Sequence, residues 1–235
     1  PREKIHLVPL GLDTSDFTIQ ADSPVATDRP LEIGYLARLA PEKGLHVLVD
    51  AFLELKKLPG MQQVRLRIAG WLGSHRREYA EQQFEKLRSA GYEDHFQYLG
   101  EVDRKGKIEF LESIDVLSVP TVYQEPKGLF VLESLAAGVP VVQPRHGAFP
   151  ELLERVGGGV LVDPGDTTAL AQALADLLSD EARRRELGLA GQQAVHSRFN
   201  AERMGADTLK VLGLIASASR SSLGDDETGH SSSHP

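Results

Sequence analysis

Short apolar segments alternate with segments of helical length along most of this chain, and this alternation restricts its fold more than any other feature. Parallel strands need a long crossover between them, usually a helix, and they are buried on both faces. The pattern therefore predicts an α/β fold with a doubly wound parallel sheet, in which ligands bind beyond the carboxyl ends of the strands. The predicted strands are Glu32–Ala37, Val64–Ala69, Phe96–Leu99, Val116–Val119, Val139–Val142 and Val160–Val162.

Helical patterns lie between these strands and after the last one. Asp166 and Asn200 precede two of the closing helices and are suitable N-cap residues. Residues 1–216 are predicted to form one domain. Residues 217–235 are rich in serine and lack apolar anchors, which predicts a disordered tail. The predicted helices are Leu45–Leu58, Arg76–Ala90, Lys105–Glu112, Leu129–Ala137, Pro150–Glu154, Thr167–Leu178, Glu181–Phe199 and Ala201–Ile215.

The composition excludes several classes of function. The formal net charge is −8, which argues against a surface dedicated to nucleic acid or to an anionic membrane. The chain has no cysteine, which rules out disulfides, thiolate catalysis and cysteine-based zinc sites. The first residues do not resemble a signal peptide, and no apolar run reaches the length of a membrane span. We therefore expect a cytoplasmic location, with no sign of membrane association.

Two carboxylates, Glu125 and Glu133, stand eight positions apart around the start of an otherwise apolar helix. A buried carboxylate is costly unless something partners it. We expect Gly128 to begin the helix and to leave its first backbone N–H groups open, and such an end attracts anions such as phosphate. The layout suggests a ligand with a phosphate at the helix end and hydroxyls near both carboxylates. The alternative is that one glutamate caps the N-terminus of the helix and the other lies at the edge of the helix face that packs on the domain.

A second group of residues follows the first predicted strand. Arg38 lies just past the end of that strand, and Lys43 and Gly44 stand at the start of the next helix. A lysine at a helix N-terminus opposes the helix dipole unless an anion sits there. Arg38 and Lys43 either form a diphosphate clamp or are solvated surface residues.

Four blocks of this sequence resemble those of the group 1, or family 4, glycosyltransferases of the GT-B fold. They are Val8-Pro-Leu-Gly-Leu-Asp13 with Phe17, Gly34 to Gly44, Leu99-Gly100-Glu-Val102 followed by Asp115-Val-Leu-Ser-Val-Pro120, and Glu125 to Val142. The resemblance covers about residues 4–215 and is to the C-terminal half, a Rossmann-like domain that binds a nucleotide sugar. Where family members often carry Gly-Phe-Gly after the first glutamate, this chain has Pro126-Lys127-Gly128. Because of that departure, the resemblance does not identify the donor sugar.

The resemblance implies a role for each candidate residue. Arg38 and Lys43 would hold the donor diphosphate, and Glu125 would contact the sugar hydroxyls near the reacting carbon. Glu133 would accept hydrogen bonds from the ribose. The remaining donor-binding residues would be Gly128 and Leu129, through backbone N–H groups toward the phosphate or sugar, and Val102, beside the nucleobase.

The implied reaction is a retaining transfer, hexosyltransferase-like, from a nucleoside diphosphate sugar to an unidentified acceptor. No cofactor is expected, because the nucleotide sugar is itself the substrate. An Asp-x-Asp triplet and histidines at ligand spacing are both absent, so we expect no metal and a leaving group stabilised by fixed cations. His146 is either a structural histidine or faces the donor site, and Trp71 either packs in the ordinary way or stacks on the base.

The family's acceptor-binding half precedes this one, so we expect this chain to need a missing N-terminal domain for transfer. Two other functions stay open. One is a sugar-nucleotide epimerase or a phosphorylase on the same scaffold, although no additional acid–base pair and no pyridoxal-phosphate lysine motif is evident. The other is a non-catalytic nucleotide-sugar-binding module, against which Arg38, Lys43, Glu125 and Glu133 argue.

Overall fold

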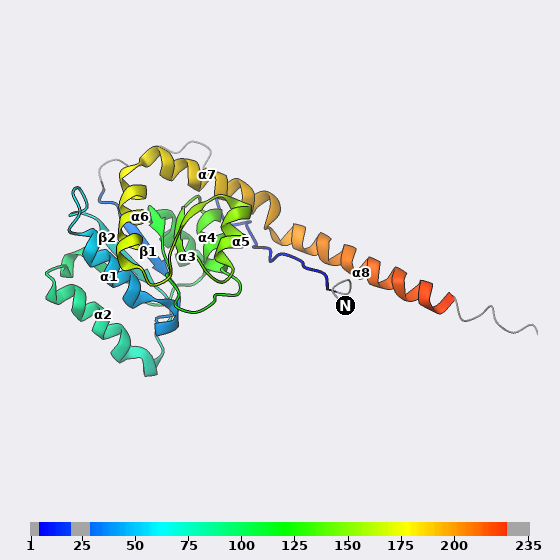
Figure 1. Ribbon diagram of the computed structural model, residues 1–235, viewed down its shortest axis with the longest axis horizontal. Coiled ribbons are helices and arrows are strands. Elements are labelled where there is room, and N and C mark those ends of the chain that lie inside the picture. The colour runs from blue at the N-terminus through cyan, green and yellow to red at the C-terminus, as the bar shows by residue number, and fades with distance from the viewer. Residues whose placement is uncertain (1–4, 20–28, 225–235) are drawn as a thin grey trace, which may run out of the picture.

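The computed structural model describes residues 5–19 and 29–224 and contains a six-stranded parallel sheet (Figure 1). The strand order is β3-β2-β1-β4-β5-β6, and every neighbouring pair is parallel. The strands are β1 (Glu32–Leu36), β2 (Arg65–Ala69), β3 (Phe96–Tyr98), β4 (Val116–Leu117), β5 (Val141–Pro144) and β6 (Gly159–Val162). The predicted α/β fold and all six predicted strands are confirmed, with ends that shift by at most two residues.

Helices connect these strands and cover both faces of the sheet. The chain steps outward from β1 to β3 on one side and from β4 to β6 on the other. Because such crossovers are right-handed, the two series place their helices on opposite faces. α1 contacts both α2 and α6, whereas α4 and α5 contact α7. The helices are α1 (Leu45–Leu55), α2 (Arg77–Ser89), α3 (Arg104–Ser113), α4 (Leu129–Ala136), α5 (Phe149–Val156), α6 (Thr167–Ser179), α7 (Glu181–Arg198) and α8 (Ala201–Gly224).

Side-chain caps set several helix starts. The predicted caps are confirmed, since Asp166 accepts a hydrogen bond from Ala169 N and Asn200 accepts one from Arg203 N. Asp103 and Asp180 cap α3 and α7 in the same way, although neither was predicted. Three short 3₁₀ turns also escaped prediction: Pro41–Lys43, Ser74–Arg76 and Glu93–His95. A turn of three residues is too short to carry a helical periodicity.

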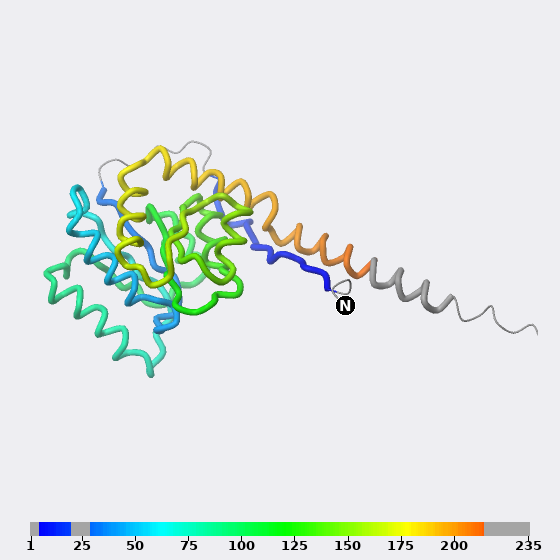
Figure 2. The backbone as a smooth tube through the Cα atoms, viewed as in Figure 1, coloured from blue at the N-terminus to red at the C-terminus, as the bar shows by residue number. Residues whose placement is uncertain are grey.

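The last helix, α8, projects from the body of the domain, and the N-terminal segment runs beside it (Figures 1 and 2). Leu12 and Asn200 form a parallel β-bridge at the base of this arm. α8 ends at Gly224 and not at the predicted Ile215, so residues 217–224 continue the helix where a disordered tail was expected. Alanine, serine, arginine and leucine before Gly224 include no helix breaker, which explains the continuation. Residues 225–235 lie outside the described part of the chain.

None of the helices within the described ranges is long and apolar enough to cross a membrane.

Candidate functional site

The candidate site lies between the neighbouring strands β1 and β4. From β1 the chain adds strands toward one edge of the sheet, and from β4 it adds them toward the other edge. The loops that leave these two strands are held together by a backbone hydrogen bond of 3.0 Å from Val122 N to Glu42 O. Gly44 has a φ of 74°, and a Cβ placed on it would lie 1.9 Å from the carbonyl oxygen of Pro120. Only glycine allows both this conformation and this approach. Ligands of doubly wound sheets bind at such a point.

Lys43 and Glu125 meet across this junction. Lys43 ends the short turn after β1, and Glu125 lies on the loop between β4 and α4. Lys43 Nζ donates to Glu125 Oε2 at 2.7 Å, and the two side chains are only 13% and 7% exposed. The structure therefore brings together two residues that are 82 positions apart in the chain.

Tyr123 completes this pair and was not predicted from the sequence. Its hydroxyl accepts a hydrogen bond of 2.8 Å from Lys43 Nζ and donates one of 2.5 Å to Glu125 Oε2. Lys43 Nζ also lies 4.9 Å from the centre of the Tyr123 ring. Its position two residues before Glu125 was the only available sequence signal, and it does not reveal the direction of the side chain.

The other carboxylate oxygen of Glu125 caps helix α4. Glu125 Oε1 accepts hydrogen bonds from the backbone N–H groups of Lys127 at 3.2 Å and Gly128 at 3.3 Å. The expectation that the helix start leaves its first N–H groups open is therefore wrong for Gly128, because the carboxylate is itself the anion at that end. The N–H of Leu129 has no hydrogen-bond partner within the described residues.

Hydrogen bonding decides the charge of both partners. Burial raises the pKa of Glu125, but the hydrogen bonds from Lys43 and Tyr123, and then from Gly128 and Lys127, lower it from 4.5 to about 2. Burial lowers the pKa of Lys43, but its hydrogen bonds to Glu125 and Tyr123 outweigh that effect and raise the pKa above 10.5. A buried carboxylate and a buried ammonium thus both stay ionised near neutral pH.

This pKa predicts a component of acid sensitivity. The folded pKa of about 2 lies below the unfolded value near 4.5, so the stabilising contribution is present above pH 4.5 and is lost as the pH falls through 2. The free energy of unfolding of wild type minus that of Glu125→Gln should be constant above pH 5. By pH 2 it should fall by roughly 3 kcal/mol. Urea unfolding at each pH measures it, and the exposed Glu109→Gln serves as the control. A difference that does not change with pH would contradict the assignment.

Arg38 lies outside this buried network. Its side chain is 56% exposed, and its ion pair with Glu42 is long, at 3.5 Å. The carbonyl of Arg38 accepts a hydrogen bond of 3.2 Å from the Tyr35 hydroxyl, which fixes the backbone of the loop. The guanidinium therefore stands at the rim of the junction, available to an anion in solution.

Glu133 belongs to a separate pair. Its carboxylate on α4 accepts a hydrogen bond of 2.7 Å from Lys107 Nζ on α3, with side chains 17% and 32% exposed. Val102 stands just before Asp103, the cap of α3, and is half-buried against the core. The sequence analysis missed Lys107, which lies 26 positions from its partner and shares no motif with it.

His146 and Trp71 also lie at this edge of the sheet. His146 is half-buried on the loop after β5, with its Nε2 3.3 Å from Thr121 Oγ1 on the loop that carries Glu125. Trp71 is 44% exposed and therefore is not part of the core. Its carbonyl accepts a hydrogen bond of 3.0 Å from Leu39 N, so the loop after β2 joins the loop of Arg38.

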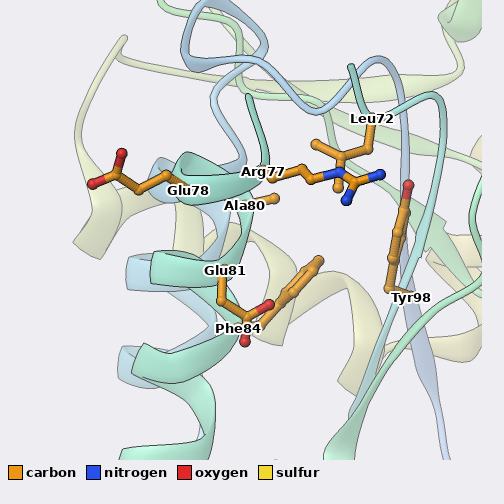
Figure 3. Close-up of a pocket in the computed structure, with 7 residues that line it drawn as sticks. All are labelled: Leu72, Arg77, Glu78, Ala80, Glu81, Phe84 and Tyr98. Atoms are coloured by element: carbon orange, nitrogen blue, oxygen red, sulfur yellow. The ribbon is translucent and has the colours of Figure 1, made fainter. Parts of the chain in front are cut away.

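A cavity of about 620 Å³ lies elsewhere, between α2 and the edge strand β3 (Figure 3). The guanidinium of Arg77 extends between Leu72 and Tyr98, and the rings of Phe84 and Tyr98 line the floor and wall of the hollow. None of the predicted site residues lines this cavity.

Within the described ranges, no cluster of three or more histidine, aspartate or glutamate side chains is placed to hold a metal ion.

Known proteins resemble this chain in sequence and in fold. Residues 16–194 match the family described as glycosyl transferases group 1. The phosphatidyl-myo-inositol mannosyltransferase of Mycobacterium leprae (strain TN) is 34% identical over 184 residues, which cover 76% of this chain and 45% of the relative. The chain spans about half the length of the curated relatives it matches.

Two solved structures share the fold. Anabaena Alr3699/HepE, crystallised with UDP and glucose, superposes with a TM-score of 0.70 at 23% identity, covering 80% of this chain and 49% of that one. The C-terminal domain of a group 1 glycosyl transferase family protein (LpcC) from Francisella tularensis gives a TM-score of 0.69 at 21% identity. It covers 81% of this chain and is itself covered completely.

Proposed function

This chain belongs to the group 1 glycosyl transferase family, and from that premise we propose that it is the donor-binding domain of a glycosyltransferase that uses a nucleoside diphosphate sugar. The observation that carries the proposal is the buried Lys43–Glu125 pair at the β1–β4 junction. It supplies a cation and a carboxylate side by side, where a doubly wound sheet binds its ligand. A sugar diphosphate needs both groups, because the cation binds its phosphates and the carboxylate accepts hydrogen bonds from its hydroxyls.

Each candidate residue has a proposed role in that site. Lys43 and the exposed Arg38 would hold the diphosphate, with the N–H of Leu129 at the start of α4 as a further donor. Glu125 would accept hydrogen bonds from the transferred sugar, and Glu133 from the ribose. Val102, next to the start of α3, would border the nucleobase. Gly128 shapes the start of the helix rather than donating, because its N–H already binds Glu125.

The chemistry follows from the charges. Cleavage of the anomeric C–O bond leaves a nucleoside diphosphate with growing negative charge and a sugar with oxocarbenium character. Lys43 and Arg38 can stabilise the leaving diphosphate without reorganising, which is the most effective form of electrostatic catalysis. We propose a metal-independent reaction on this basis. The same family resemblance is the ground for proposing that the anomeric configuration is retained.

A second domain is proposed to supply the acceptor. The chain spans about half the length of its curated relatives. The N-terminal segment and α8 run side by side in the arm (Figure 2). Both carry exposed apolar residues: Ile5 is 77% exposed, Leu7 76%, Leu209 71% and Leu212 56%. Large exposed apolar side chains on neighbouring segments are typical of an interface. We propose that an N-terminal domain packs on this arm and binds the acceptor.

Nucleoside diphosphates should stabilise the folded chain in the absence of metal. A ligand that binds only the folded state raises the melting temperature, and at 100 times its Kd it adds about 2.7 kcal/mol. We expect at least one of UDP, GDP, ADP and TDP at millimolar concentration to raise the melting temperature, equally in EDTA and in magnesium.

Two results would count against the proposal. An unchanged melting curve with all four diphosphates would remove the donor site. A stabilisation that disappears in EDTA and returns with magnesium or manganese would keep the donor site but overturn its metal independence.

A further inference from the structure

The carboxylate of Glu125 has no acceptor position left. A carboxylate offers about four lone-pair positions to donors. Glu125 Oε1 receives two backbone N–H groups, from Lys127 and Gly128, and Oε2 receives Lys43 Nζ and the Tyr123 hydroxyl. A sugar hydroxyl can donate to Glu125 only if one of these four donors leaves.

The four donors differ in how easily they can leave. The two N–H groups belong to the backbone at the start of α4 and move only with the helix. Removing Lys43 would leave a 7% exposed carboxylate without its countercharge, which is among the most costly changes in a protein interior. Tyr123 is neutral and half-buried, so its hydroxyl can turn toward water at the cost of ordinary hydrogen bonds.

We propose that the Tyr123 hydroxyl is a place-holder for a hydroxyl of the donor sugar and leaves Glu125 when the sugar binds. It donates to Glu125 Oε2 and accepts from Lys43 Nζ, and a sugar hydroxyl offers the same one donor and the same acceptor lone pairs. The inference rests on the proposed function, because it assumes that Glu125 contacts the sugar. Tyr123 then competes with the sugar but not with the phosphates.

The matched test is Tyr123→Phe, which keeps the aromatic ring beside Lys43 and removes only the hydroxyl. Calorimetry would give the Kd of a bare nucleoside diphosphate and of its sugar conjugate, such as UDP with UDP-glucose and GDP with GDP-mannose. We expect the variant to bind the sugar conjugate about 3- to 10-fold more tightly than wild type. Its affinity for the bare diphosphate should stay within about 2-fold, because Lys43 and Glu125 stay paired.

Tyr98→Phe is the control. Its hydroxyl binds the carbonyl of Gly70 at 2.9 Å and has no contact with Lys43 or Glu125. We expect the ratio of the two Kd values to be unchanged in this variant. A second readout is the ultraviolet difference spectrum of tyrosine, which should appear when the sugar conjugate binds wild type and be lost in Tyr123→Phe.

The outcomes separate the inference from the function on which it rests. Sugar-conjugate affinity that is unchanged or weaker in Tyr123→Phe overturns the place-holder role, and a parallel loss for the bare diphosphate assigns Tyr123 to holding Lys43 instead. If wild type binds neither ligand, the proposed function itself has failed.

Discussion

Lys43→Met is expected to lower the free energy of unfolding by about 3 kcal/mol, because it leaves the buried carboxylate of Glu125 without its countercharge. The two side chains are 13% and 7% exposed, so water has little access to the carboxylate once the ammonium group is gone. The remaining donors, Tyr123 and two backbone N–H groups, reduce the loss but do not cancel it. Urea unfolding at pH 7 measures the change.

A double variant shows whether the loss comes from the unpaired charge. Lys43→Met with Glu125→Gln removes both charges, and replacing a buried pair costs far less than breaking it. We expect the double variant to be more stable than Lys43→Met alone. Lys107→Met is the matched control, since its pair with Glu133 is more exposed and should contribute about 1 kcal/mol or less. Additive losses in the double variant would contradict the buried-pair account.

Sugar transfer is expected to depend on a domain that precedes this one. Holding an acceptor against the anomeric carbon converts a two-substrate reaction into an effectively unimolecular one, with effective molarities of about 10⁵ M or more. We expect this chain alone to bind donor and transfer negligibly. A polypeptide that joins it to an N-terminal α/β domain should transfer at least about 100-fold faster.

Transfer of a radiolabelled sugar to a panel of sugars and polyols measures this dependence. The control is donor affinity, which should be similar in the short and the extended chain. A short chain that transfers as fast as the extended one would place an acceptor site within the domain described here and remove the proposed need for a second domain.

The fold could largely be predicted from the sequence because its strands are short and rich in apolar residues, whereas its helices are longer and show a helical pattern. Ile33, Leu66 and Val116 are completely buried, as the central strands of a parallel sheet require. The end of α8 was not readable, since residues 217–224 combine a disorder-like composition with residues that tolerate a helix. Helix ends depend on such weak preferences and are the least certain part of any sequence-based assignment.

Only part of the candidate site could be predicted from the sequence, because some of its residues are recognised only by where their side chains point. Lys43 and Glu125 could be identified because each carries a charge beside apolar sequence at a strand end. Tyr123 and Lys107 could not, because their roles depend on side-chain directions set by the tertiary structure. The sequence left open whether a glutamate here faces a ligand or caps the helix, and the structure shows that Glu125 does cap α4, where its carboxylate accepts two backbone N–H groups.

Calorimetric titration of wild type and Arg38→Ala with nucleoside diphosphates tests the central claim, a donor site at the β1–β4 junction, most directly. Arg38 suits this test because its side chain is 56% exposed and, among the described residues, forms a single long ion pair of 3.5 Å, so its removal should not alter the fold. We predict that wild type binds at least one of UDP, GDP, ADP and TDP, and that Arg38→Ala binds it roughly 10-fold more weakly with an unchanged melting temperature of the free protein. Absence of binding by wild type, or equal affinity in the variant, would contradict the account.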